Sequence, residues 1–87
     1  METKDYLRLA TEYSIKMWDF DIVLYAGEED GWHYFSCTRE GRPKYSSLPT
    51  ALRINKSGKI EEVGGFDIRF KISHMAHQMM ANDKGHH

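Results

Sequence analysis

The sequence has little of what marks a secreted or membrane protein. Cys37 is the single cysteine among 87 residues, so no internal disulfide can form and a reducing compartment is favoured. No apolar run approaches the roughly 18 residues of a membrane span. The N-terminus has neither the basic start nor the apolar stretch of a signal peptide. These absences predict a cytoplasmic protein that does not enter a membrane.

Motifs of catalysis and cofactor binding are also missing. The chain has no glycine-rich phosphate loop, no cysteine pair and no His-Glu-x-x-His. His74 and His77 stand three apart, as two metal ligands on a helix do, but a metal site needs further donors. Cys37 falls at a strand position, where burial is a simpler expectation than a role as nucleophile. The sequence therefore predicts no enzyme activity, no cofactor and no metal site.

What the chain does contain is enough apolar material for one small core. Hydrophobic residues make up 40% and aromatic residues 13%, which argues against wholesale disorder. We expect a single domain over residues 1–82 and, at 83–87, a disordered tail or the remnant of a purification tag. The net charge of −1 hides a split, because residues 1–37 carry eight acidic and three basic side chains, whereas residues 38–60 carry one acidic and six basic. Such a split makes a dipolar surface if the segments fold to different sides.

In the first half of the chain, the spacing of apolar residues changes once, from helical spacing to alternation. A helix is predicted from Lys4 to Trp18, where apolar side chains recur at helical spacing, and Thr3 is expected to cap it. Residues from Phe20 to Ala26 then alternate as in a half-buried strand. Asp30-Gly31 is typical of a hairpin turn, and the aromatic run Trp32–Thr38 is expected to be the returning strand.

The second half predicts a loop, two more strands and a helix. Glycine, proline and serine indicate a loop at 39–47, and strands are expected at Pro49–Asn55 and Lys59–Val63 with a turn between them. Phe66–Ile72 leaves two interpretations open, since its strict alternation favours a strand while the spacing to the following methionines favours a helix. A compromise keeps this segment extended and begins the helix at Ser73.

These elements predict an α+β domain with an N-terminal helix, an antiparallel sheet of three or four strands and a C-terminal helix. A fifth strand is added if 66–72 is extended. The expected architecture has two layers, with both helices on one face of the sheet. The opposite face is then open, unless the loop at 39–47 folds over it and completes a second small core.

The hairpin register decides which side chains occupy the open face. Pairing through Asp30-Gly31 would place Ala26 opposite Phe35 and Leu24 opposite Cys37. A change of one residue in the loop would turn the second strand over. In the preferred register, the open face holds aromatic and basic side chains: Val23, Tyr25, Trp32, Tyr34 and Arg53. Such residues are enriched where proteins contact partners.

The basic stretch 39–59 offers a second candidate surface. Its leading candidates are Arg39, Arg42, Lys44, Tyr45 and Arg53. The order helix, three strands, helix is also that of double-stranded-RNA-binding domains, and Gly41-Arg42-Pro43-Lys44 loosely echoes their basic loop. The chain lacks the lysine-rich start of their second helix, and its overall charge is not basic. Nucleic-acid binding is therefore kept as the alternative hypothesis.

About half of the chain shows one further pattern. The segments are Gly31–Phe35, Leu48-Pro49 and Asn55–Ile60. Together they resemble short bacterial proteins of unknown function, which have a leading helix, a hairpin with an aromatic returning strand and a Leu-Pro entry to the third strand. The resemblance implies the α+β fold and carries no activity with it.

The sequence thus favours a small protein that acts by binding. The expected partner is another protein or a second copy, in which the basic segment of one chain could meet the acidic Asp19–Asp30 of the other. The predicted contact residues are Tyr25, Trp32, Tyr34, Arg39, Arg42, Lys44, Tyr45 and Arg53.

Overall fold

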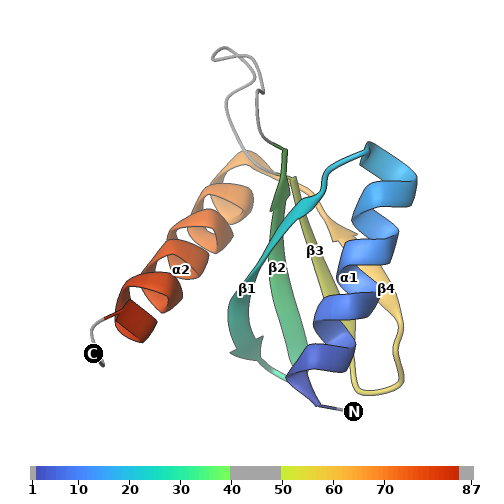
Figure 1. Ribbon diagram of the computed structural model, residues 1–87, viewed down its shortest axis with the longest axis horizontal. Helices are drawn as coiled ribbons and strands as arrows, with labels where there is room; N and C mark the ends of the chain where they lie inside the picture. The colour runs from blue at the N-terminus through green and yellow to red at the C-terminus, as the bar shows by residue number, and fades with distance from the viewer. Residues whose placement is uncertain (1, 40–49, 85–87) are drawn as a thin grey trace.

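The computed structural model describes residues 2–39 and 50–84, which form two helices and four strands. The elements are α1 (Thr3–Trp18), β1 (Ile22–Glu29), β2 (Trp32–Thr38), β3 (Thr50–Asn55), β4 (Ile60–Val63) and α2 (Phe66–Lys84). The strands make one antiparallel sheet in the order β1-β2-β3-β4 (Figure 1). The predicted α+β fold, with a helix at each end of the chain, is confirmed.

Helix α1 begins one residue earlier than its sequence suggests. Glu2, not Thr3, is the N-cap, and its backbone N–H donates to Oδ2 of Asp5 at 3.0 Å. The helix ends at Trp18, and the next residue, Asp19, adopts the left-handed conformation with φ 59°. There its N–H donates to the carbonyl of Ile15 at 3.0 Å, a common way to close a helix.

Helix α2 resolves the two interpretations of residues 66–72. It starts at Phe66, directly after Gly65 turns the chain with φ 96°, and Arg69 N–H donates to the carbonyl of Gly65 at 3.1 Å. Ile72 and Ala76, four residues apart, are its buried contacts, so helical spacing rather than alternation positions the side chains. The compromise start at Ser73 is wrong. The helix continues to Lys84 and so includes the first two residues of the expected tail, while 85–87 lie outside the described residues.

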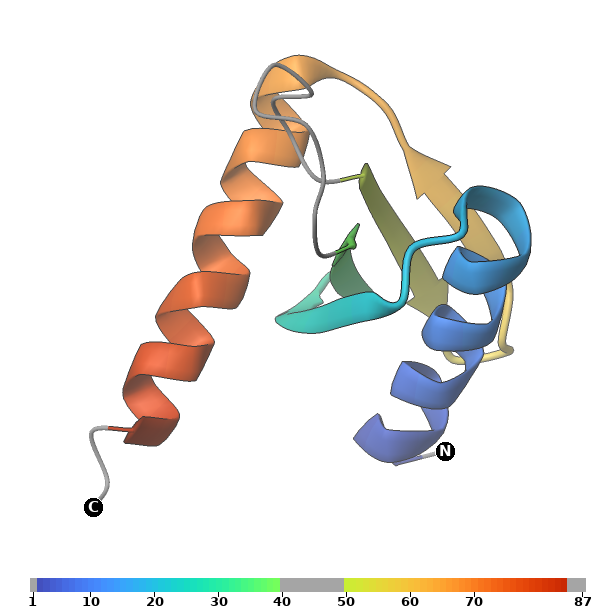
Figure 2. The ribbon, with the colours of Figure 1, turned by 45° about the horizontal axis from the view of Figure 1, so that its top comes forward.

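The two helices lie on opposite faces of the sheet (Figure 2). On one side, Tyr6 and Ala10 of α1 pack in a cluster with Phe35, Leu52 and Ile54. On the other, α2 contributes to a separate cluster, whose buried members are Ala26, Ala51, Ile72 and Ala76. The expectation that both helices share one face is therefore corrected. Alternation within each strand supplies both clusters, because neighbouring residues point to opposite faces.

The β1–β2 hairpin has the predicted turn but a different register beyond it. Asp30 and Gly31 both have positive φ (54° and 81°), and Glu29 pairs with Trp32 across the turn, as a type I′ turn requires. An irregularity between Tyr25 and Gly27 then shifts the pairing by one residue.

The shift makes the predicted strand partners wrong. Phe35 pairs with Tyr25 instead of Ala26, and Cys37 pairs with Val23 instead of Leu24. An extra residue in one strand is a β-bulge, which turns the remainder of that strand over. Its conformation depends on Gly27, whose φ of 119° is rarely accessible to residues with a side chain.

Candidate functional site

The α2 side of the sheet brings together three residues predicted from the sequence. Trp32, Tyr34 and Arg53 all lie on this face and are half-buried. Tyr34 of β2 pairs directly with Arg53 of β3, and Trp32 is the diagonal neighbour of Arg53 on the same face. α2 packs mainly over β1 and β2 (Figure 1), so the face extending across β3 and β4 is less covered.

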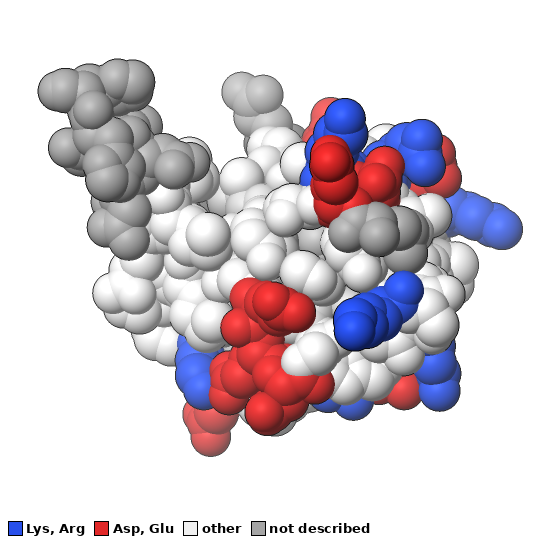
Figure 3. All heavy atoms as spheres, turned by 90° about the horizontal axis from the view of Figure 1, so that it is seen from below, with Lys and Arg blue, Asp and Glu red and all other residues white. Residues whose placement is uncertain are grey.

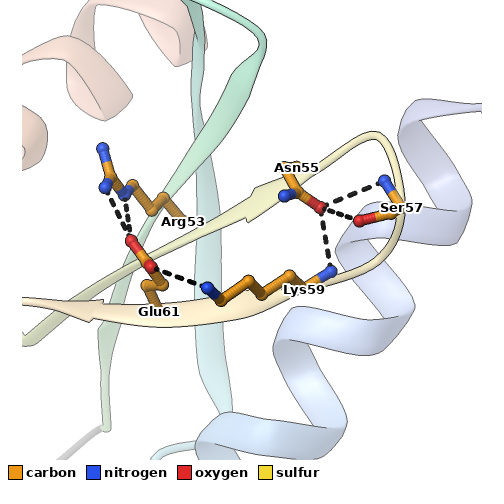
Figure 4. A network of polar contacts seen from close by, with 5 residues as sticks. All are labelled: Arg53, Asn55, Ser57, Lys59 and Glu61. Atoms are coloured by element: carbon orange, nitrogen blue, oxygen red, sulfur yellow. Dashed lines mark hydrogen bonds and ion pairs between the residues drawn. The ribbon is translucent and has the colours of Figure 1, made fainter.

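Arg53 joins these residues into one polar cluster. Its Nε and Nη2 donate to Oε1 of Glu61 at 3.0 and 2.6 Å (Figure 4). Its Nη1 donates to the hydroxyl of Tyr34 at 3.3 Å, and the guanidinium carbon lies 4.0 Å from the ring centre of Trp32. The planar guanidinium can hydrogen-bond and stack at once. We call Trp32, Tyr34, Arg53 and Glu61 the Arg53 cluster.

The β3–β4 turn fixes the positions of Arg53 and Glu61 within the Arg53 cluster. Asn55 Oδ1 accepts hydrogen bonds from the backbone N–H groups of Ser57 and Lys59, both at 3.0 Å, and from the Ser57 hydroxyl at 2.8 Å. This arrangement closes the turn predicted at 55–58 and places Arg53 opposite Glu61 (Figure 4). Lys59 Nζ adds a second cation 3.5 Å from Glu61. Hydrogen bonds from Arg53 are the main cause that lowers the pKa of Glu61.

Two adjoining hollows run between the Arg53 cluster and α2, and Tyr34 and Ile68 line both. The first, of about 200 Å³, is also lined by Glu29, Lys71, Ile72 and Met75. The second, of about 280 Å³, is also lined by Arg53, Glu61, Glu62, Val63 and Gly64. We call the two hollows together the α2-side groove. Ile68, which is 50% exposed, lines the groove together with Tyr34, Arg53 and Glu61 of the Arg53 cluster. The groove therefore combines an apolar side with fixed polar groups.

Tyr25 does not belong to this face. The bulge turns it to the α1 side, where it is half-buried and its ring centre lies 5.4 Å from that of Phe35. Its hydroxyl lies 3.0 Å from Nδ1 of His33, whose ring stacks on Tyr6 at 4.1 Å. Burial, and then the charge of Glu28, raise the pKa of Tyr25. The structure places Tyr25 in the α1-side core, and Val23 with it.

The basic stretch 39–59 is largely paired with carboxylates within the described residues. Arg39 lies at the far end of β2 from Trp32 and forms an ion pair with Asp19 at 3.1 Å. Arg53 and Lys59 both contact Glu61. The predicted residues Arg42, Lys44 and Tyr45 lie outside the described part of the chain. The positive segment and its acidic counterparts thus neutralise each other partly within one molecule.

Sequence reasoning missed several residues of the groove. Glu61 could have been found, because the turn at 55–58 fixes the β3–β4 register and places it opposite Arg53. The choice between strand and helix at residues 66–72 was left open, and for this reason the sequence did not predict a site formed by Ile68, Ile72 and Met75. Only a helix beginning at Phe66 places these three side chains together beside the sheet.

Cys37 is fully buried, and burial raises the pKa of its thiol to about 11, which disfavours the reactive thiolate. In residues 2–39 and 50–84, no three His, Cys, Asp or Glu side chains gather in a way that could hold a metal ion. Neither helix, over its described length, is long and apolar enough to cross a membrane.

Comparison with family models, curated proteins and solved structures finds no match. The resemblance to short bacterial proteins therefore stays a prediction.

Proposed function

We propose that the protein acts by binding, and that its α2-side groove receives a segment of a partner protein in the cytoplasm. The observation that supports this is the Arg53 cluster, whose polar groups are held in place beside the half-exposed Ile68. Groups that are already ordered lose little entropy on binding. A partner segment gains area by inserting apolar side chains against Ile68 and Met75, while the cluster sets its orientation.

Binding fits the groove better than catalysis. Glu61 is the carboxylate at the centre of the cluster, but it is already held by Arg53 and Lys59. The lowered pKa of Glu61 works against its taking up a proton, as a general base near neutral pH must do. The cluster is therefore suited to a fixed contact surface.

A protein segment also fits better than a nucleic acid. A phosphate approaching Arg53 would compete with the two short hydrogen bonds to Glu61, and Arg39 is engaged with Asp19. Phosphate binding draws on cations that release counterions when they bind. Cations already neutralised by carboxylates contribute less to it.

A peptide library displayed on phage tests the groove directly. We expect peptides with one or two large apolar residues to be enriched on the wild-type protein and to lose at least tenfold in affinity with Ile68→Glu. Phe70→Glu is the matched control, because Phe70 is 59% exposed on the same helix and lines neither hollow. No enriched peptide, or equal binding by both variants, would contradict the proposal.

Two further measurements separate the alternatives. Fluorescence anisotropy with double-stranded RNA at low salt should show no binding, and affinity that falls steeply with salt would favour the nucleic-acid hypothesis. Sedimentation of the free protein should show a monomer. A dimer that Ile68→Glu dissociates would make a second copy, rather than another protein, the occupant of the groove.

A further inference from the structure

The outer edge of β1 is open to an additional strand. β1 pairs with β2 alone among the described strands, and it is eight residues long. Its first six residues, Ile22–Gly27, carry no charge. Figure 2 shows this strand in front, between the diverging helices. The other edge differs, since β4 has four residues and two of them are Glu61 and Glu62. Charged edges resist pairing, whereas uncharged edges accept it.

Both helices place exposed apolar side chains next to this edge. Near the start of β1, Ile15 of α1 is 48% exposed and lines a hollow of about 240 Å³ with Asp19, Asp21 and Arg39. Near its end, Met79 of α2 lies beside Gly27, within 3.8 Å of where a Cβ would stand. Side chains of a strand alternate between the two faces. An added strand would therefore meet α1 on one face and α2 on the other.

Acidic residues flank the uncharged stretch at both ends. Asp21 precedes β1, and Glu28, Glu29 and Asp30 follow the uncharged run; all four are exposed. On the face seen from below, Figure 3 shows Asp and Glu side chains gathered in one patch. Asp19 is engaged with Arg39, but Asp21, Glu29 and Asp30 lie in none of the ion pairs within the described residues.

The acidic residues at both ends of β1 determine which kind of strand can pair with its outer edge. Pairing of two β1 edges would bring the exposed acidic ends of both strands close together, and like charges at close range destabilise such a pairing. A strand with Lys or Arg at both ends would instead meet a carboxylate at each end. A second copy is disfavoured by the same residues that favour a basic-flanked strand.

We propose that the β1 edge takes up, as a fifth strand, an extended segment of a partner protein with apolar residues in alternation and basic residues at both ends. Main-chain hydrogen bonds hold such a strand, and alternate side chains give it specificity. The bulge at Ala26 restricts regular pairing to Ile22–Tyr25, so the interaction is short and reversible. This edge is separate from the α2-side groove, and the proposal does not depend on that groove.

The test uses the full chain and synthetic peptides of about ten residues. One peptide alternates valine and threonine with two lysines at each end, a second has glutamates in place of the lysines, and a third has prolines in place of the valines. We expect only the lysine peptide to bind, and amide hydrogen exchange measured by NMR to slow along β1 and not along β4. Equal binding of the proline peptide, protection confined to the α2-side groove, or no binding of the lysine peptide would overturn the proposal.

Charge reversal adds a matched comparison. Asp21→Lys with Glu29→Lys should weaken the lysine peptide about tenfold and allow the glutamate peptide to bind. The control, Glu12→Lys with Asp67→Lys, changes the net charge equally at two exposed helix positions and should leave both affinities unchanged. Equal losses in the two double variants would mean that net charge alone acts. Self-association of the wild-type chain through β1 would replace the proposed partner by a second copy.

Discussion

The two faces of the sheet are packed with side chains of different size. Against α1 the sheet buries Phe35, Leu52 and Ile54 completely. Against α2 its buried hydrophobic residues are Ala26 and Ala51, and α2 itself adds Ile72 and Ala76. Alanines allow the helix to approach closely but bury little apolar area. The same strands therefore build a core of large side chains on one face and a contact of mostly small side chains on the other.

This difference indicates which face the protein can use without losing its fold. Residues that hold the fold together are concentrated against α1. The α2 side retains a groove and exposed apolar residues, including Ile68 and Met79. Substitutions on the two faces should therefore differ in their cost to stability, and this contrast can be measured.

The largest loss is expected from Leu52→Ala on the α1 side. Leu52 is completely buried between β3 and α1, and removing such a side chain leaves a cavity that the surroundings fill only in part. We expect the free energy of unfolding to fall by about 3 kcal/mol. Urea denaturation followed by circular dichroism measures it. A loss below that of the α2-side substitution Ile72→Ala would contradict the assignment of the main core to the α1 side.

Ile72→Ala should have the next largest effect. Ile72 is 3% exposed and is the large member of the buried cluster between the sheet and α2, whose other buried residues in the described part of the chain are alanines. Because its surroundings are mostly small side chains, we expect a loss of about 2 kcal/mol. Hydrogen exchange should rise mostly within α2, while β2 and β3 stay protected. Equal acceleration throughout the sheet would mean that the two faces unfold as one tightly coupled unit.

The sequence predicted the elements better than it predicted their faces. Element order, the turn at Asp30-Gly31 and the four strands followed from local patterns that the structure confirms. The extra residue at the bulge was not predicted, although Gly27, a glycine inside a strand, is the kind of local signal that often marks one. That one residue moved Tyr25 from the predicted contact surface into the α1-side core.

The candidate site was predictable in part for the same reason. Trp32, Tyr34 and Arg53 lie in β2 and β3, beyond the reach of the bulge, and they share a face as expected. Nothing local in the sequence indicated that α2 would cross to the side opposite α1. Apolar residues at 66–72 satisfy two periods at once, so the choice between strand and helix was made by tertiary packing.

Gly27→Ala tests the bulge that separates the two faces. An added methyl would meet no atom closer than 3.8 Å, but the φ of 119° is strained for any residue with a Cβ. The expected loss is therefore a backbone cost of about 1–2 kcal/mol. Gly64→Ala is the control, because that glycine has open space around it and no positive φ. Denaturant melts of both variants check the prediction, and equal stability of the two would argue against strain at the bulge.

The smallest effect is expected at the Arg53 cluster, and it should depend on pH. Arg53 lowers the pKa of Glu61 below its ordinary value of 4.5. A carboxylate with a lowered pKa in the folded state stabilises the protein above its ordinary pKa, and this contribution is lost as the pH falls through the folded-state value. Arg53→Met should therefore be less stable than wild type near neutral pH, and the difference should shrink below pH 4.5. Urea melts at several pH values measure it, with Lys59→Met as the control for the weaker contact at 3.5 Å. A difference between wild type and Arg53→Met that stays constant with pH would mean that Arg53 acts through its stacking on Trp32, and that its pairing with Glu61 adds nothing to stability.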